Sequence, residues 1–148
     1  MKKANAKENE GKLLTETELE LMTILWKLGE GSVTDVMGHL PKDRDLAYTS
    51  VSTIMRILEQ KGILKTRKEG RGHIYTPQLK KSDYEAKTVK HVVDRVFDGT
   101  PVALVRQLLD TVKLGESDLK ELKKLIDQAG GKKWVEKFWK VVDGWKEK

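Results

Sequence analysis

Cysteine is absent from the sequence, and long apolar runs and aromatic residues are scarce. Without cysteine, disulfide bonds and thiolate metal sites are excluded, and the chain suits a reducing compartment. No apolar run approaches the roughly 18 residues that a membrane span needs, and the opening residues MKKANAKENEGK have no apolar stretch of the signal-peptide kind. We therefore expect a cytoplasmic protein.

Groupings typical of catalysis or metal binding are missing as well. The histidines His39, His73 and His91 lie in different predicted elements, and none has a partner at ligand spacing. The glycines on either side of Arg71 fit a hairpin turn better than a phosphate-binding loop. We predict no enzyme activity, no metal site, no cofactor and no small-molecule ligand.

The composition favours association with another chain. The 148 residues fit one domain, or a small domain with an association segment. Aromatic residues make up 6% of the sequence and charged residues 35%, which suits helices that bury their apolar faces against a partner. Residues 1–12 are charged, small and aperiodic, and they predict a disordered arm. We expect an oligomer.

The segment from residue 47 to residue 77 predicts a helix followed by a β-hairpin. Apolar residues recur at three-and-four spacing, so one stripe holds Val51, Ile54, Met55 and Leu58. Polar residues fall on the opposite side of the same helix, at Thr49, Ser52, Thr53, Arg56 and Gln60. Gly62 ends the helix, and two short strands then flank a turn that contains Gly70 and Gly72.

The charge of this segment points to DNA. Between Arg56 and Lys80 there are seven basic residues and two acidic ones, an excess of five in a chain whose net charge is +6. An exposed helix face can reach base edges in a major groove, while cations on the hairpin hold phosphates. The predicted DNA-binding residues are Thr49, Ser50, Ser52, Thr53 and Arg56 on the helix, and Arg67, Lys68 and Arg71 on the hairpin. The alternative is that the charged surface serves solubility and that the basic hairpin only protects an edge strand.

Two helices are predicted before this segment. Thr15 and Glu18 form a capping box, and the apolar stripe that follows reaches Leu28. A short strand is expected at residues 32–33, and Thr34 is the expected cap of a brief helix. The order helix, short strand, helix, helix, hairpin is that of a winged helix-turn-helix domain, predicted over residues 13–80.

Three further helices are predicted over residues 81–128. Ser82 and Glu85 form a second capping box at the start of the first, Pro101 occupies the first position of the second, and Gly115 precedes the third. Because helices this short cannot build a sound core alone, we predict a homodimerisation domain. The expected contact residues are Val89, Val92, Val93, Val96, Phe97, Val105, Leu108, Leu109, Leu122, Leu125 and Ile126. The alternative is that these helices pack on the N-terminal domain.

Residues 129–148 predict an amphipathic helix rich in tryptophan. Trp134, Phe138 and Trp145 share one stripe, and lysines occupy the other side. This profile fits both a helix that straps across a dimer and a helix that lies on a membrane surface. Gly144 weakens the helix, and the segment follows an oligomerising region, so the strap is favoured.

Several stretches together resemble one family. LTETELELMTILWKLG, AYTSVSTIMRILEQKGIL, the wing EGRGHIYTP and the later SDYEAK and FDGT are similar to the penicillinase repressors of the BlaI/MecI type. The resemblance covers residues 13–126. It implies a homodimeric bacterial repressor that occupies a palindromic operator, reads DNA from the helix at residues 49–56 and dimerises through its C-terminal helices.

The resemblance also implies a sensor membrane metalloprotease as a partner. Induction in the antibiotic-sensing members resembles cleavage of an Asn-Phe bond in the second dimerisation helix, where this sequence has Gln107-Leu108. The copper-responsive relatives carry a C-terminal cysteine cluster, so the lack of cysteine here excludes copper sensing through thiolates.

The sequence therefore predicts a mainly α fold with a small β-hairpin wing, in which a winged helix-turn-helix DNA-binding domain precedes a helical dimerisation domain. The predicted function is that of a sequence-specific transcriptional repressor that binds double-stranded DNA as a homodimer. The competing hypothesis is a winged-helix protein-interaction module whose tryptophan-rich tail binds a partner or a membrane surface.

Overall fold

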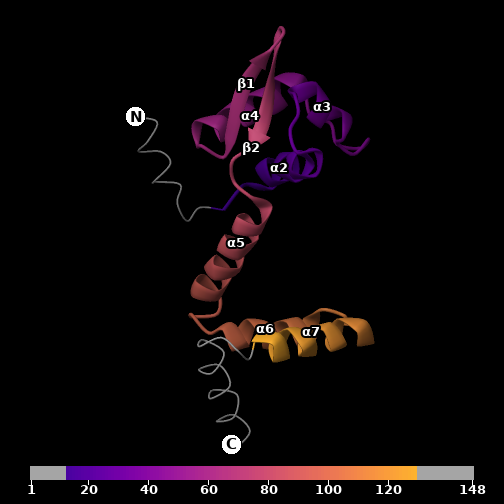
Figure 1. Ribbon diagram of the computed structural model, residues 1–148, viewed down its shortest axis with the longest axis vertical. Helices are drawn as coiled ribbons and strands as arrows, with labels where there is room; N and C mark the ends of the chain where they lie inside the picture. Colours follow the sequence, from indigo (N-terminus) through magenta and orange to yellow (C-terminus); the bar gives the residue numbers. More distant parts are fainter. Residues whose placement is uncertain (1–12, 130–148) are drawn as a thin grey trace, which may run out of the picture. The chain divides into compact units, whose positions relative to one another are not determined.

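The fold is mainly helical with one antiparallel β-hairpin, as Figure 1 shows for the computed structural model, which describes residues 13–129. The chain divides between Gly99 and Thr100 into two compact units. The first unit contains α2 (Glu16–Leu28), α3 (Val33–Gly38), α4 (Tyr48–Gln60), β1 (Leu64–Glu69), β2 (Gly72–Pro77) and α5 (Lys81–Arg95). The second contains α6 (Pro101–Thr111) and α7 (Glu116–Gln128). The division follows α5, whereas the domain boundary predicted from the sequence precedes it.

Two groups of predictions concern residues outside this range. The disordered arm was predicted for residues 1–12, and the tryptophan stripe lies within residues 130–148, so both are outside the described residues. Among residues 13–129, no helix combines the length and apolar character needed to cross a membrane.

The predicted capping box at the start of α2 is confirmed. The Thr15 hydroxyl accepts a hydrogen bond from the amide of Glu18 at 3.2 Å, and the Glu18 carboxylate accepts one from the amide of Thr15 at 2.9 Å. The helix then buries Leu21, Met22 and Leu25 completely. α2 is therefore one wall of the core, as its apolar stripe predicts.

The predicted start of α3 is wrong. Ser32, not Thr34, is the N-cap, because its hydroxyl accepts from the amide of Asp35 at 3.1 Å and the Asp35 carboxylate accepts from the amide of Ser32 at 2.9 Å. The short strand expected at residues 32–33 is reduced to one β-bridge at Gly31, which pairs with Tyr75 of β2. Ser32 itself has an extended backbone, but Val33 is already the first helical residue, so no strand forms over residues 32–33.

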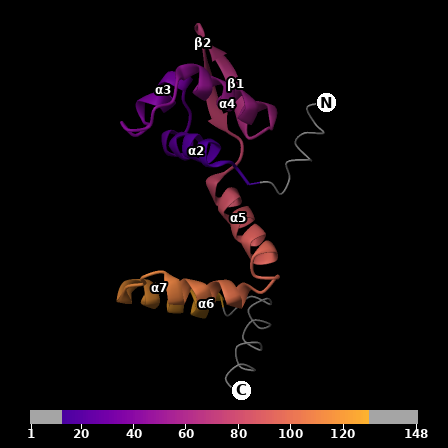
Figure 2. The same cartoon turned by 180° about the vertical axis from the view of Figure 1, so that it is seen from behind.

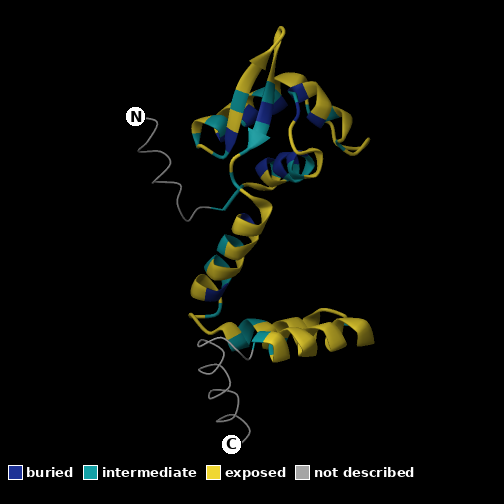
Figure 3. Cartoon of the chain, in the orientation of Figure 1, coloured by how far each residue is buried: buried dark blue, intermediate teal, exposed yellow. Residues whose placement is uncertain are grey.

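α4 fits into the core by the stripe that the sequence predicts. Val51, Met55 and Leu58 are fully buried, and Ile54 packs against them from a partly buried position. Figure 3 shows buried positions on α2, α3, α4 and the hairpin, and exposed positions along the outer sides of the same elements. The core cluster consists of Leu21, Met22, Leu25, Val33, Val36, Val51, Met55, Leu58, Leu64 and Tyr75.

The β-hairpin has the predicted position and a tight turn. β1 and β2 are antiparallel, with Leu64 opposite Pro77 and Glu69 opposite Gly72. Gly70 has a φ of 62°, which a residue with a side chain adopts only at a cost, so glycine suits this corner of the turn. The view from behind in Figure 2 shows the hairpin close to α4 and extending beyond it.

Within the first unit, aromatic side chains connect α5 to α2 and to the segment that follows the hairpin. The Trp26 indole donates a hydrogen bond from Nε1 to the carbonyl of Leu79 at 2.9 Å, and its ring lies 5.9 Å from the ring of Tyr84. The Tyr84 hydroxyl accepts from the amide of Leu14 at 3.1 Å. The capping box predicted at Ser82 is wrong, since α5 begins at Lys81 without a side-chain cap and Ser82 lies inside the helix.

The second unit contains two amphipathic helices. Pro101 occupies the first turn of α6, as predicted, and the amide of Gly115 donates to the carboxylate of Asp118 at 3.1 Å where α7 begins. Neither helix has a buried residue. Seven large apolar side chains are exposed instead: Val105, Leu108, Leu109, Val112, Leu119, Leu122 and Leu125.

Candidate nucleic-acid interface

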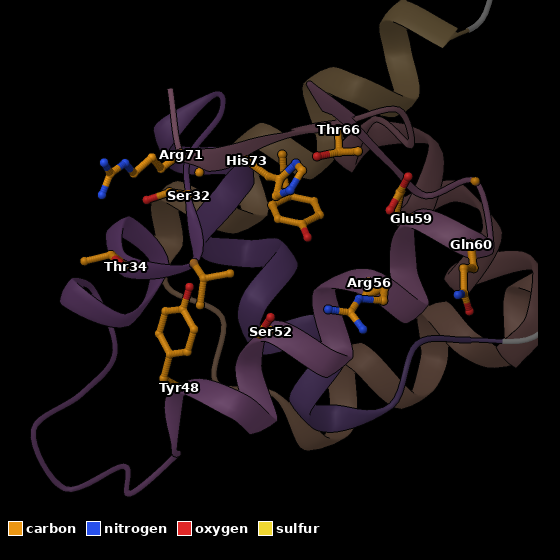
Figure 4. Close-up of a pocket in the computed structure, with 14 residues that line it drawn as sticks. Ser32, Thr34, Tyr48, Ser52, Arg56, Glu59, Gln60, Thr66, Arg71 and His73 are labelled. Atoms are coloured by element: carbon orange, nitrogen blue, oxygen red, sulfur yellow. The ribbon is translucent and has the colours of Figure 1, made fainter. Parts of the chain in front are cut away.

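A cleft of about 890 Å³ lies between α4 and the hairpin and reaches the start of α3 (Figure 4). The exposed side of α4 forms one wall, and the cleft-facing residues of both strands form the other. The lining residues are Ser32, Val33 and Thr34 at α3, Tyr48, Ser52, Arg56, Glu59 and Gln60 on α4, and Gly62, Thr66, Arg71, Gly72, His73 and Tyr75 on the hairpin side. A cleft with walls from a helix and a hairpin can hold an elongated, charged ligand.

The structure divides the predicted helix residues into two rows. Ser52 and Arg56 line the cleft, whereas Thr49, Ser50 and Thr53 are exposed outside it. The Thr53 hydroxyl donates to the carbonyl of Thr49 at 2.7 Å. Thr53 therefore offers a methyl group and a hydroxyl oxygen to a ligand, because its hydroxyl proton is already used.

Tyr48 is a cleft residue that the sequence reasoning missed. It is 54% exposed and is the first residue of α4, four positions before Ser52 and eight before Arg56. Residues at that spacing share one line along a helix. The signal was therefore present in the sequence, but Tyr48 was not counted with the polar face.

Two side chains of opposite charge on α4, Glu59 and Arg56, affect the pKa of Tyr75 in the cleft. Burial raises the pKa of the Tyr75 hydroxyl, the negative charge of Glu59 raises it further, and the positive charge of Arg56 opposes both. These side chains are therefore close enough to influence one another. Within the described chain, neither Arg56 nor Glu59 has an ion-pair partner.

One buried hydroxyl on the hairpin side of the cleft has no partner. The Thr66 Oγ1 atom is buried and makes no hydrogen bond to any part of residues 13–129. Thr66 lines the cleft, and its cross-strand neighbour is Tyr75. The hairpin wall thus includes polar groups as well as cations.

The predicted phosphate-binding residues differ in their surroundings. Lys68 and Arg71 are exposed, and neither forms an ion pair within residues 13–129. Arg67 is held by Glu30 and by Glu69, the latter at 3.1 Å. The hydrogen bond from Arg67 lowers the pKa of Glu30, and the two carboxylates raise the pKa of the Arg67 guanidinium.

Two ion pairs support α4 from α2. Arg44, in the loop before α4, donates to Glu20 at 3.0 Å and to the hydroxyl of Thr17 at 3.2 Å. Lys61, at the end of α4, donates to Glu18 at 3.0 Å. Burial alone would raise the pKa of Glu18, but the amide of Thr15 and the ammonium of Lys61 outweigh burial and lower it.

The predicted dimerisation residues occupy several environments. Val93 is buried, whereas Val92, Phe97 and Ile126 are half-buried. The exposed members are Val89, Val96, Val105, Leu108, Leu109, Leu122 and Leu125. An apolar face suited to another surface is therefore present on α6 and α7.

Possible metal ligands are dispersed. Over the range 13–129 no three His, Asp or Glu side chains come together as a set that could hold a metal ion.

Comparison with known proteins finds a family model and several repressors among the relatives. The family model described as penicillinase repressor matches residues 14–128. The penicillinase repressor of Bacillus licheniformis is 28% identical over 120 residues, which are 81% of this chain and 94% of that protein. The methicillin resistance regulatory protein MecI of Mammaliicoccus sciuri is 23% identical over 115 residues, which are 78% of this chain and 94% of that protein. The solution structure of the DNA-binding domain of the repressor BlaI is 34% identical, covers 48% of this chain and 87% of that chain, and has a TM-score of 0.44.

Proposed function

This chain belongs to the penicillinase repressor family, and from that premise we propose that it represses transcription as a cytoplasmic homodimer bound to a palindromic operator. Each copy presents one α4 to the major groove and one hairpin to the phosphate backbone. The observation that carries this proposal is the cleft, where Arg56 of α4 and Arg71 of the hairpin belong to one continuous surface.

Base reading is assigned to the exposed side of α4. Arg56 is exposed and has no ion pair in the described part of the chain, so its guanidinium is available for a bidentate contact with guanine. Thr49, Ser50, Ser52 and Thr53 add small hydroxyl and methyl groups suited to base edges. These side chains contribute nothing to the core, so they are free to serve recognition.

Substitution of Arg56 tests the base contact. Arg56→Ala should cost about 1 to 3 kcal/mol of binding to the preferred site and relax the preference at one base pair. Arg56→Lys is the matched control for charge, because lysine keeps the cation and loses the planar fork. We expect the lysine variant to lose the base preference while it keeps the salt dependence. Unchanged preference in both variants, measured by selection from a randomised duplex pool, would refute the assignment.

Phosphate holding is assigned to Lys68 and Arg71. Alanine at either position should weaken binding to all sequences alike and reduce the slope of log Kobs against log salt by about one. Fluorescence anisotropy at several salt concentrations measures this slope. A slope that stays at its wild-type value in both variants would place the phosphate contacts elsewhere.

Dimerisation is assigned to α6 and α7. Their apolar side chains are exposed, an arrangement that marks an interaction site, and a second copy of the same face would cover them. Two-fold symmetry would then place two reading heads on an inverted repeat. Footprinting on the DNA around the gene tests this arrangement, and a protected inverted repeat is the expected result.

The competing hypothesis of a protein-interaction module is not favoured by any feature of the first unit. It depended on the tryptophan-rich tail, which lies outside the described residues. Absence of any protected DNA at moderate salt would support it. The sensor metalloprotease stays a prediction of the resemblance, and the residues at the matching bond, Gln107 and Leu108, are exposed on α6.

A further inference from the structure

The turn between α2 and α3 touches both strands of the hairpin through one side chain. Glu30 accepts hydrogen bonds from Nη1 of Arg67 and, at 3.2 Å, from Nη2 of the same guanidinium. The Thr76 hydroxyl of β2 also donates to Glu30 at 3.4 Å. Nη2 of Arg67 reaches Glu69 of its own strand at 3.1 Å. A single carboxylate thus links the turn to β1 and β2.

The next residue adds a backbone link at the same place. The amide of Gly31 donates to the carbonyl of Tyr75 at 3.0 Å, and the amide of Tyr75 donates to the carbonyl of Gly31 at 2.9 Å. Two consecutive residues therefore hold the hairpin, Glu30 by its side chain and Gly31 by its backbone. Such paired contacts fix the hairpin more firmly than one exposed ion pair would.

The strand register places Arg67 on the face of the hairpin away from the cleft. Thr66 pairs with Tyr75 and Lys68 pairs with His73, and the cleft-lining residues Thr66, Tyr75 and His73 all belong to these two pairs. Because side chains alternate along a strand, Arg67 projects from the opposite face, together with Thr76 and Lys65. Arg67 therefore differs from Lys68 and Arg71 both in direction and in being neutralised by two carboxylates.

We propose that Glu30 and Arg67 form a brace that sets the position of the hairpin against α4, and that Arg67 is a positioning residue and not a phosphate contact. This inference rests on the proposed function and replaces the phosphate-binding role that the sequence predicted for Arg67. The brace keeps Lys68 and Arg71 at a fixed distance from the exposed side of α4, to which base reading is assigned. Arg67 acts on DNA only through those two neighbours.

DNA binding by the full chain tests the brace. The variants are Glu30→Gln, Arg67→Gln and the double variant, and the probe is a duplex selected by the wild-type protein from a randomised pool. Each single variant should weaken binding about two- to fivefold, and the double variant should be no weaker than either, because both remove the same interaction. The salt slope should stay at the wild-type value in all three.

The sign of the Glu30→Gln effect separates the brace from a phosphate contact. If Arg67 held a phosphate, removal of its competitor Glu30 would strengthen binding, and Arg67→Gln would lower the salt slope by about one. Either result would overturn the brace. Glu85→Gln is the matched control for loss of one negative charge, since Glu85 is exposed on α5 and makes no ion pair within the described residues.

A second measurement tests the brace without DNA. Hydrogen exchange of the Gly31 and Tyr75 amides should be faster in both single variants than in the wild type and in Glu85→Gln, because the bridge opens more often when the brace is removed. Unchanged exchange would overturn the brace. A wild-type chain that selects no duplex from the pool would instead overturn the proposed function, so the two failures are distinguishable.

Discussion

α2 and α7 each have 13 residues and an apolar stripe, yet among the described residues α2 has fully buried side chains and α7 has no buried residue. α2 buries Leu21, Met22 and Leu25 completely, whereas Leu119, Leu122 and Leu125 of α7 stay exposed. An amphipathic pattern thus predicts that a helix has a partner and leaves open which chain supplies it. Residues 13–99 contain their own core, while residues 100–129 present an apolar face and bury no side chain.

The largest expected effect is on the free energy of unfolding, after substitution of a buried residue of α2. Leu25→Ala should lower the free energy of unfolding of the first unit by about 2 to 5 kcal/mol, because it removes a fully buried side chain and leaves a cavity. Leu125→Ala, at an exposed position of α7, should change that free energy by less than about 0.5 kcal/mol. Hydrogen exchange of the α4 amides measures both. Equal effects would remove the distinction between the two regions.

The next effect is on the dissociation constant of the dimer that we propose to form through the apolar face of α7. Leu122→Asp should weaken the proposed homodimer on the order of 100-fold, about 3 kcal/mol, because a carboxylate would be buried in an apolar interface. Lys124→Asp is the control, since that position lies on the opposite side of the same helix. Sedimentation equilibrium measures both dissociation constants. If Leu122→Asp dimerises as tightly as the wild type, the apolar face of α7 is not the interface.

A third prediction uses the pH dependence of the first unit. The pKa of Glu18 is lowered in the folded chain from its ordinary value of 4.5, so its contribution to stability is present above that value and is lost as the pH falls through the folded pKa. Glu18→Gln should cost about 1 to 3 kcal/mol at neutral pH, and this difference from the wild type should shrink below about pH 4. Urea denaturation at several pH values checks the trend. A difference that is constant from pH 7 to pH 3 would contradict it.

The smallest effect tests which contacts hold α5 to the rest of the first unit. Trp26→Phe keeps an aromatic ring near Tyr84 and removes the hydrogen bond to the carbonyl of Leu79. It should cost about 0.5 to 1.5 kcal/mol and speed hydrogen exchange in α5 as well as in α2. If exchange in α5 stays the same while α2 loosens, the attachment of α5 depends on other contacts.

Most of the fold could be predicted from local sequence. The capping box at Thr15, the stripe through Val51 and Met55, and the turn at Gly70 are confirmed because each depends on residues close together in the chain. The wrong assignments also have local causes. The Ser82 pattern matched a capping box, but the N-cap is Lys80, two residues earlier, and nothing in a four-residue pattern fixes that register.

The candidate site was less predictable, because its contacts join distant residues. Arg67 was assigned to a phosphate from its place in a basic hairpin, but its partner Glu30 lies 37 positions away along the chain. Periodicity shows which face a residue occupies and does not show which distant carboxylate meets it. The division of the α4 polar side into a cleft row and an outer row depended on the hairpin position in the same way.

The support of α4 from α2 has a consequence for how specificity changes. Glu20 and Glu18 hold the loop before α4 and the end of α4, and the buried stripe holds the middle. None of these contacts uses the outward side chains at residues 49, 52, 53 and 56. If these side chains read bases as proposed, a new set of residues at the four positions would alter the preferred DNA sequence, while the contacts that hold α4 stayed intact. On the proposed function, operator preference could then change by substitution at these four positions alone, without change to the core of the domain.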